Sequence, residues 1–597
     1  MKEKSSSAPY GKEISLTSNT NMETKETIRK FALLNAFGHE GKAQMQSVLG
    51  KILAEQPHLK TKIKEVANLV KEVVEEINKL QPGEQKRLIE KSWPEALLKE
   101  KIEEERILPS LPNVEKYKRV VTRFSPNPDC VLHLGSARAI VLCYEYAKKY
   151  DGVFYLRFED TDPRLKKSAL QFYDSIRRDL IWLGCKWDAE FIQSDRILIY
   201  YEHAEKLLSN GHAYVCTCQS KEFRRKILVK KPCPCRDLSP SDNFVRWKHM
   251  LNGAYKEGEA VVRVKTDLTH PNPAVRDWPA LRIIDTTRYP HPRVGSKYRV
   301  WPLYNFACGI DDHLIGVTHI IRGKEHLTNQ IRQEYMYTHF GWEYPEAIHY
   351  GRLKVTGASL SKSKIVEGVR SGVYRSWDDP RLATFLALRR RGIAPEAVKS
   401  LIIDVGPKTS DVTLSWENLY AHNRKIIDPV AKRYFFVHNP TELSVEKIPH
   451  PFVTKLPLHP DHPRKGFRYF KIEPKKNKAS FLISSNDIDL LKARKKIRLM
   501  GLFNFKVEKI RKHLIEASFS SKSHEEAKKL GAPLIHWLPI DTGVSCEVTM
   551  PDASIAKGMA EENCKKLHSD DIIQFERFGF ARIDKVDKGI TAYFAHR

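Results

Sequence analysis

Two short motifs, far apart in the chain, carry residue types suited to phosphate chemistry. The first motif spans residues 123–136 and ends in His133-Leu134-Gly135-Ser136, just before an apolar stretch that predicts a helix over Ala137 to Tyr150. A helix N-terminus attracts phosphate because its free N–H groups and its dipole both favour an anion. The second motif, Ser359-Leu360-Ser361-Lys362-Ser363-Lys364, places two lysines in a hydroxyl-rich loop. Together the motifs indicate an enzyme that activates a nucleotide.

A βαβ unit is predicted to position the first motif. A hydrophobic strand, Val120 to Phe124, enters a loop that two prolines keep from becoming helix, and a second strand, Val153 to Phe158, follows the predicted helix. The second strand ends in Glu159-Asp160-Thr161-Asp162. Ligands bind beyond the carboxyl ends of strands in open α/β sheets, so both strand ends are expected at the ligand site.

Composition shifts divide the 597 residues into segments. Apolar residues at helical spacing from Ile63 to Ile77 indicate helices before a proline-containing linker, Leu108 to Asn113. Short β-like runs after Tyr434 indicate antiparallel barrels, and the apolar stretch Trp301 to Arg322 is interpreted as sheet. The predicted segments are a flexible tail (1–24), a helical appendage (25–106), an α/β domain (113–213 and 290–345) with an insertion (214–289), a helical region with the second motif (346–433) and β-barrels (434–597).

The charge of the chain points to its class of partner. The net charge is +28, more than solubility requires, so nucleic acid is the leading partner and a lysine-rich surface without one is the alternative. No stretch reaches the run of about 18 apolar residues that a membrane helix needs, and the first 25 residues lack an apolar signal core. We therefore expect a cytoplasmic protein whose ten cysteines are reduced.

Four cysteines of the insertion form two close pairs, Cys216 with Cys218 and Cys233 with Cys235. Tetrahedral zinc is bound by thiolates from two turns, so the pairs favour a structural zinc site. One residue separates the cysteines of each pair, fewer than the usual spacing of about two to four. Free reduced thiols are the alternative.

Further motifs lie between the first two: Arg157 to Asp162, Tyr304 to His313 and Ile320 to Gly323. Together with the first and second motifs, they resemble the class I aminoacyl-tRNA synthetases of the glutamyl/glutaminyl branch, and within it the archaeal-type glutamyl-tRNA synthetases. The resemblance implies a Rossmann-type catalytic domain, an insertion that binds the acceptor end of tRNA, and anticodon-binding barrels at the C-terminus.

The resemblance also implies a two-step reaction that uses ATP with Mg²⁺, glutamate and tRNA(Glu). Glutamate attacks the α-phosphate of ATP, and the glutamyl group then passes to the terminal ribose of the tRNA. The catalytic residues carried over are His133, Lys362 and Lys364. The ATP-binding residues are Pro126, His133, Gly135, Ser136, Ser361, Lys362 and Ser363. The glutamate-binding residues are Arg123, Glu159, Tyr304, Cys308 and Arg322.

Several positions depart from the family pattern. Ser136 stands where a histidine is common, and its hydroxyl is expected to cap the helix. Ser359 replaces the leading lysine of the second motif, Cys130 replaces a glycine and is expected to be buried, and Cys308 stands where some members have an amide.

Other interpretations stay open from the sequence alone. For each lysine of the second motif, the alternative is a solvated surface residue. For Arg322, the alternative is a structural ion pair with Asp311 or Asp312. The chain could instead charge glutamine, or bind tRNA without catalysis. Basic stretches at Lys221 to Lys248 and Lys492 to Arg498 are predicted to face tRNA. We expect a monomer, and charging of tRNA(Gln) is left open.

Overall fold

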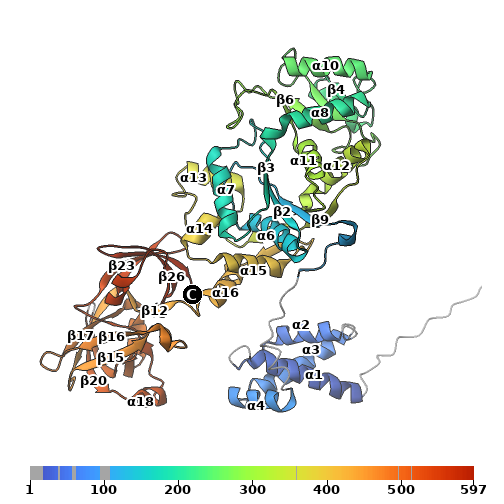
Figure 1. The fold of residues 1–597 in the computed structure, drawn as a ribbon. Helices are drawn as coiled ribbons and strands as arrows, with labels where there is room; N and C mark the ends of the chain where they lie inside the picture. The colour runs from blue at the N-terminus through green and yellow to red at the C-terminus, as the bar shows by residue number, and fades with distance from the viewer. Residues whose placement is uncertain are drawn as a thin grey trace, which may run out of the picture. The chain divides into compact units, whose positions relative to one another are not determined.

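The computed structural model describes residues 18–37, 41–56, 59, 62–93, 108–357, 360–494, 496–511 and 514–597 (Figure 1). The chain forms two compact units, residues 1–107 and 108–597. In its described part, the first unit consists of α1 (Ser18–Phe37), α2 (Met45–Glu55), α3 (Ile63–Ile77) and α4 (Pro82–Ser92). α1 packs against the other three helices, and α3 buries Val66, Val70, Val73, Val74 and Ile77, while Ile63 is exposed. α1 begins inside the predicted tail, and residues 94–106 of the predicted appendage lie outside the described residues.

A parallel sheet begins the second unit, with β1 (Val121–Phe124), β2 (Val153–Phe158) and β3 (Ala189–Ile192) as neighbours in that order. β8 (His319–Gly323) pairs in parallel with β9 (Glu346–Tyr350). β8 lies beside β1, because the Thr318 amide donates to the Val121 carbonyl (3.0 Å) and the Val121 amide donates to Thr318 Oγ1 (2.8 Å). α6 (Leu134–Lys149) and α7 (Leu170–Trp182) share the core of this sheet. The α/β class predicted for this region is confirmed.

The observed βαβ unit is close to the predicted one. β2 has the predicted bounds and β1 begins one residue later. α6 begins earlier than predicted, at Leu134, because this residue is buried and extends the apolar face of the helix. The cap residue is therefore His133, and the prediction that Ser136 caps the helix is wrong, since Ser136 is the third residue of α6.

A four-stranded antiparallel sheet forms the insertion: β4 (Ala213–Cys216), β5 (Val261–Val264), β6 (Pro279–Ile283) and β7 (Val300–Pro302), in that order. The helices of this region are α8 (Ile197–Ser209), α9 (Ser220–Leu228), α10 (Pro240–Asn252), α11 (Tyr304–Leu314) and α12 (Leu327–Phe340). The sheet thus extends past the predicted boundary at residue 289. The stretch Trp301 to Arg322, interpreted as sheet, has strand at its two ends, in β7 and β8 (His319–Gly323), but its middle is α11, because an apolar run without alternation does not distinguish a helix from a buried strand.

The segment with the second motif joins the core of the parallel sheet. Its strands β10 (Leu353–Val355) and β11 (Val412–Leu414) pair in parallel. Its helices are α13 (Lys362–Arg370), α14 (Phe385–Arg390), α15 (Pro395–Val405) and α16 (Trp416–Ile427). α15 packs against both α6 and α16, which fixes this segment to the sheet that carries the first motif.

Two seven-stranded sheets make up most of the C-terminal region. The first contains, in spatial order, β12 (Lys432–Tyr434), β25 (Ile572–Phe575), β26 (Gly579–Val586), β27 (Ile590–His596), β23 (Val544–Thr549), β24 (Ile555–Ala560) and β13 (Phe436–His438). The second contains β21 (Leu534–Ile535), β18 (Lys496–Leu499), β19 (Asn504–Ile510), β20 (Leu514–Ser521), β14 (Pro440–Glu446), β17 (Ala479–Ser484) and β22 (Leu538–Pro539).

The remaining C-terminal elements are the hairpin of β15 (Phe452–Pro457) and β16 (Phe467–Ile472), and the helices α17 (Ile488–Ala493) and α18 (His524–Lys529). Most pairings in the two large sheets are antiparallel, as predicted, but four join strands in parallel: β12 with β25, β23 with β27, β14 with β20 and β18 with β21. Strands distant in sequence meet in these pairs, and periodicity within each strand does not reveal their direction. Across the described residues, no helix combines the length and apolarity that a membrane span requires.

Candidate functional site

A cavity of about 620 Å³ lies at the carboxyl ends of β1, β2 and β8. Its lining includes Arg123 in β1, Glu159 directly after β2, Tyr304 at the start of α11 and Arg322 in β8. Four of the five residues predicted to hold glutamate therefore come together from distant parts of the sequence. The fifth, Cys308, is 1% exposed and is not among the residues that line the cavity.

Asp312, in α11, fixes the guanidinium of Arg123. Arg123 donates to both carboxylate oxygens, from Nε at 2.9 Å and from Nη2 at 3.1 Å. Arg157 Nη1 donates to the same carboxylate at 2.7 Å. Although burial opposes its ionisation, the two guanidinium groups hold the pKa of Asp312 well below its usual range. Arg123 is therefore held in one orientation at the cavity wall, with part of its hydrogen-bonding capacity already used.

Arg157 is a second buried guanidinium, and sequence reasoning gave it no role. It is fully buried in β2, and its Nη2 donates to Glu159 Oε1 at 3.0 Å and to Cys308 Sγ at 3.1 Å. Cys308 thus contacts Arg157 behind the cavity wall. The signal that could have revealed Arg157 is a charged residue within an otherwise apolar strand, because such a charge is buried only with a partner.

Arg322 is a buried cation of the cavity wall, and no ion pair with a carboxylate is found for it within the described residues. It is 5% exposed and donates to Gln333 Oε1 (3.1 Å) and to the Tyr344 hydroxyl (3.0 Å), both neutral groups. The alternative in which Arg322 pairs with Asp311 or Asp312 is wrong. Asp312 is taken by Arg123 and Arg157, and Asp311 accepts from Arg196 Nε at 2.8 Å. A buried positive charge at a cavity wall without an anion favours an anionic ligand.

The loop of the first motif holds polar atoms that lack partners. Ser125 Oγ, Asn127 Oδ1 and His133 Nδ1 are buried and form no hydrogen bond with the described residues. Buried polar atoms are rarely left without a partner, so their gathering in one loop indicates the place of a polar ligand. Burial lowers the pKa of His133, which keeps its ring neutral near pH 7 and able to donate to an oxygen. Cys130 is buried, as predicted.

Gly135 lets the two motifs approach each other. A Cβ at this position would lie 2.9 Å from His133 Cε1 and 3.4 Å from Leu360 Cδ1. The second motif therefore packs directly over the start of α6, and a side chain at position 135 would separate the two. Ser136 follows in the same helix turn, and Pro126 lies in the preceding loop, so these ATP-site candidates occupy one region.

Lys362 connects the two motifs. It is the first residue of α13, and its Nζ forms an ion pair with the Asp129 carboxylate of the first motif. Lys364 is exposed two residues later, where helix geometry places it on a different face of α13. Ser361 and Ser363 are exposed and hydrogen-bonded to each other at 3.2 Å. Ser359 lies outside the described residues.

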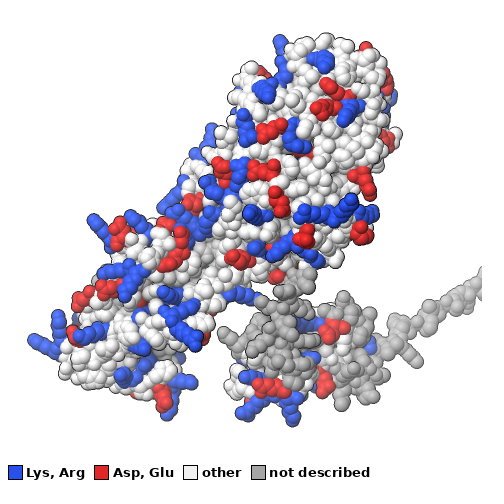
Figure 2. Space-filling view, viewed as in Figure 1, with Lys and Arg blue, Asp and Glu red and all other residues white. Residues whose placement is uncertain are grey.

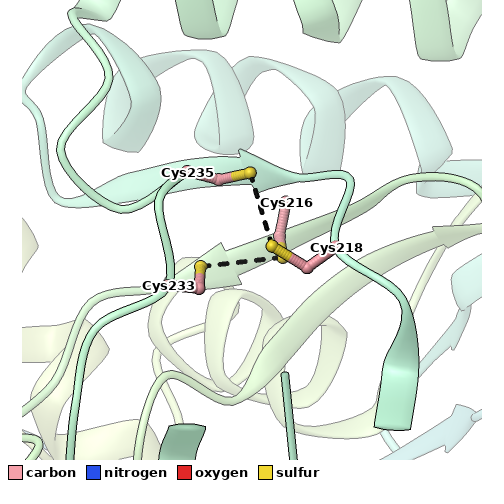
Figure 3. Close-up of side chains that lie close together, drawn as sticks. All are labelled: Cys216, Cys218, Cys233 and Cys235. Carbon is pink, nitrogen blue, oxygen red and sulfur yellow. Dashed lines mark hydrogen bonds between the residues drawn. The ribbon is translucent and has the colours of Figure 1, made fainter. Parts of the chain in front are cut away.

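The four cysteines of the insertion converge (Figure 3). Their sulfur atoms lie within 4.8 Å of one another, with Cys216 and Cys233 at 3.9 Å and Cys218 and Cys235 at 3.8 Å. A tetrahedral zinc with Zn–S bonds of about 2.3 Å requires sulfur–sulfur edges of about 3.8 Å, so the donor set and its geometry fit this ion. Arg246 Nη1 donates to Cys235 Sγ at 3.2 Å, the kind of outer contact that orients a thiolate ligand.

We expect the purified protein to carry about one zinc per chain, bound by these four thiolates. Cys233→Ser should lose the metal and lower the melting temperature, because an ion held by thiolates from two segments contributes its binding free energy to folding. Zinc content by mass spectrometry and calorimetry of the same samples measure the two effects. Cys143→Ser, a buried cysteine of α6 outside the cluster, is the control and should keep the zinc. A wild-type protein purified without zinc would contradict the assignment.

On the face that Figure 2 shows, the basic side chains of residues 108–597 do not gather into one patch. On the visible face of residues 108–597, lysine and arginine are interspersed with acidic residues (Figure 2). Within the predicted tRNA-facing stretch Lys492 to Arg498, Arg498 is 6% exposed and donates to Asn504 Oδ1 at 2.9 Å, so it is a structural residue. Lys492 is exposed, as are Arg224 and Lys248 on α9 and α10 of the insertion.

Comparison with known proteins assigns families to three parts of the chain. Residues 119–429 match the catalytic domain of class I tRNA synthetases for E and Q, and residues 431–520 and 534–584 match two anticodon-binding domains of the same enzymes. The chain is 52% identical to the glutamate–tRNA ligase of Pyrococcus furiosus over 583 residues, which cover 96% of this chain and 100% of that protein. It is 50% identical to the glutamate–tRNA ligase of Thermococcus kodakarensis over 581 residues, again with 96% and 100% covered.

Proposed function

Because the chain belongs to the class I tRNA synthetases for glutamate and glutamine, and is thus an aminoacyl-tRNA synthetase, we propose that it attaches glutamate to tRNA(Glu). ATP with Mg²⁺ would activate glutamate to glutamyl-AMP with release of pyrophosphate, and the glutamyl group would pass to the 3′-terminal ribose of the tRNA. The proposal takes the enzyme to act as a monomer, which light scattering of the active protein tests.

The observation that carries this proposal is the charge balance of the cavity. The guanidinium groups of Arg123 and Arg157 are matched by the carboxylates of Asp312 and Glu159. Arg322 adds one positive charge with only neutral partners. The side-chain carboxylate of glutamate supplies the missing negative charge, whereas the amide of glutamine would leave a buried guanidinium poorly paired.

The first and second motifs supply the proposed chemistry of activation. Attack on the α-phosphate needs little covalent help from the protein, so positioning and stabilisation of negative charge carry most of the rate. Neutral His133 can donate to a phosphate oxygen, and Lys362 can bring a positive charge to the triphosphate from the facing motif. Glu159 remains the proposed partner of the α-ammonium group, and Tyr304 its neighbour in the cavity wall.

We expect KM for glutamate to stay constant between about pH 5.5 and 8. Burial, followed by the charge of Arg322, lowers the pKa of both His326 and His349 to about 4. Because these pKa values lie below the usual value for histidine, both rings stay neutral throughout this range and gain charge only near pH 4. Initial rates at varied glutamate across the range measure KM. An inflection near pH 6.5 would mean that a cavity histidine titrates normally, contrary to this expectation.

Purified protein with ATP and Mg²⁺ tests the proposal, using radiolabelled glutamate or glutamine and either tRNA(Glu) or tRNA(Gln). Glutamate attached to tRNA(Glu) supports it, and attachment to tRNA(Gln) as well would mark an enzyme that serves both tRNAs. Glutamine attachment would overturn the role given to Arg322. Tight tRNA binding with no product under any condition would identify a binding protein without catalysis.

A further inference from the structure

Gln333 is a buried polar residue that contacts the site from behind the cavity wall. It lies on α12, is fully buried, and is not among the residues that line the cavity. Its Oε1 accepts from Arg322 Nη1 at 3.1 Å and from the Tyr344 hydroxyl at 2.8 Å. Its Nε2 donates to the Asn305 carbonyl at 3.4 Å. The amide meets donors on its oxygen side and an acceptor on its nitrogen side, so one orientation satisfies it.

Arg322, Gln333 and Tyr344 form a closed ring of hydrogen bonds. Arg322 Nη2 donates to the Tyr344 hydroxyl at 3.0 Å, and that hydroxyl donates in turn to Gln333 Oε1. On the remaining edge of the guanidinium, Arg322 Nε donates to His349 Nε2 at 3.4 Å. Burial, followed by the charge of Arg322, lowers the pKa of His349 to about 4, so this ring is neutral near pH 7. Three neutral acceptors thus orient Arg322 without cancelling its charge.

The two other guanidinium groups of the site are oriented by a carboxylate. Arg123 donates to both oxygens of Asp312, and Arg157 donates to one of them. A carboxylate orients a guanidinium as an amide oxygen does, but it also supplies a negative charge that cancels the positive one. Gln333 orients Arg322 as Asp312 orients Arg123, yet it leaves the charge in place. The choice between amide and carboxylate at position 333 therefore sets the net charge that the cavity presents to a substrate.

The stem of Gln333 is fixed by the contact between α11 and α12. Gly309 of α11 lies against it, since a Cβ at this glycine would be 2.4 Å from Met336 Cε and 3.5 Å from Gln333 Cγ. A side chain packed this tightly has no room to turn its head group away from Arg322. Glutamate has nearly the shape of glutamine, so a carboxylate at position 333 would meet the same guanidinium.

We propose that Gln333 determines the specificity of this enzyme, selecting glutamate over glutamine because it holds Arg322 through a neutral group. With an amide at position 333, the positive charge of Arg322 remains available to the side-chain carboxylate of the substrate. With a carboxylate at position 333, that charge would be cancelled within the protein, and the substrate carboxylate would be buried beside a neutral pair. Gln333 is thus a positioning residue that acts through Arg322. The inference rests on the proposed function, because it requires glutamate as the amino acid.

The test compares Gln333→Glu with Gln333→Met. Both variants remove the amide, but only Gln333→Glu adds a negative charge beside Arg322. We expect Gln333→Glu to lower the ratio of kcat/KM for glutamate to kcat/KM for glutamine by at least about 10²-fold, the usual scale for a buried charge pair. Gln333→Met should lower this ratio by no more than about tenfold, because one hydrogen bond to the guanidinium is lost while its charge remains. Aminoacylation of tRNA(Glu) at varied glutamate or glutamine measures the ratios.

Inhibition by glutamine gives a second readout that a structural role would not change. The inhibition constant of glutamine against glutamate should fall for Gln333→Glu, because the amide of glutamine then meets a neutral pair. It should not fall for Gln333→Met. A site that is merely damaged would bind both amino acids more weakly, and melting temperatures identify a variant that is poorly folded. Equal losses for glutamate and glutamine with a folded Gln333→Glu enzyme would overturn the proposal.

Gln330→Glu is the matched control. It makes the same substitution one turn earlier on α12, where the Gln330 amide donates to Glu334 Oε1 at 2.8 Å and the side chain does not line the cavity. The ratio of the two kcat/KM values should stay as in the wild type. A change as large as that of Gln333→Glu would mean that any added negative charge on this helix alters specificity, and would overturn the role given to position 333.

A double variant tests whether Gln333 acts through Arg322. Arg322→Ala combined with Gln333→Met should lower kcat/KM for glutamate no more than Arg322→Ala alone, because the group that Gln333 orients is already absent. A further loss of about tenfold, the effect expected of Gln333→Met in the wild type, would show that Gln333 acts by another route and would overturn the inference.

Glutamylation by the wild type distinguishes failure of this inference from failure of the proposed function. A wild type that charges tRNA(Glu) with glutamate, together with an unchanged ratio for Gln333→Glu, refutes only the role of Gln333. A wild type that charges no tRNA refutes the proposed function itself.

Discussion

Replacing Arg322 by alanine is expected to lower kcat/KM for glutamate by about 10²- to 10³-fold, the usual cost of removing one member of a buried charge pair. The guanidinium is 5% exposed and faces the cavity with only neutral partners, so the substrate carboxylate would be its anion. Without Arg322 that carboxylate would be buried unpaired, whereas glutamine would lose much less. The ratio of the two kcat/KM values should therefore shift towards glutamine.

Glutamylation rates at varied glutamate measure this effect, with the melting temperature of each variant as a check on folding. Arg332→Ala is the matched control, because Arg332 lines the same cavity but donates to the Ala274 carbonyl (2.7 Å) and to Asn329 Oδ1 (3.3 Å). Arg332→Ala should lower kcat/KM for glutamate much less than Arg322→Ala does. Unchanged KM and kcat for the Arg322→Ala enzyme would show that Arg322 does not bind glutamate.

The local pattern of the sequence was sufficient to predict the strands that carry the site. β2 is an apolar run interrupted only by Arg157, with a turn before it and acidic residues after it, and such a run is typical of a buried parallel strand. The same local pattern misplaced α11, because an apolar stretch of this kind is compatible with both helix and sheet. Packing against α8 and α12 decides the outcome, and it is not visible in a single segment.

The charge network of the site could not be predicted in the same way. Arg123 and Arg322 were both expected to meet a substrate carboxylate, yet Arg123 pairs with Asp312, 189 positions later, and Arg322 does not pair with a carboxylate of the described chain. Which guanidinium stays without an anion depends on how α11 packs against β1 and β2. Sequence identifies the residue types of such a network, but tertiary packing decides the partners.

Replacing Lys362 by methionine is expected to lower the rate of glutamyl-adenylate formation by about 10²- to 10³-fold, as loss of one group that stabilises transition-state charge does. The same change at Lys364 should cost about tenfold or less. The sequence gives the two lysines equal weight, but only Lys362 meets the first motif, through Asp129. Lys364 lies on another face of α13 and is exposed. ATP–pyrophosphate exchange with tRNA present measures both rates.

The variant Lys362→Arg distinguishes the effect of the positive charge at position 362 from the effect of the shape of the side chain. Arginine keeps the positive charge but presents it on a larger, planar group, so partial activity is expected if charge stabilisation dominates. Position 359 is serine, so this position adds no further cation to the motif. The loss at Lys362 should therefore not be compensated by its neighbours. Equal losses for Lys362→Met and Lys364→Met would mean that the loop acts through its total charge, and the contact between the two motifs would then have no special part in catalysis.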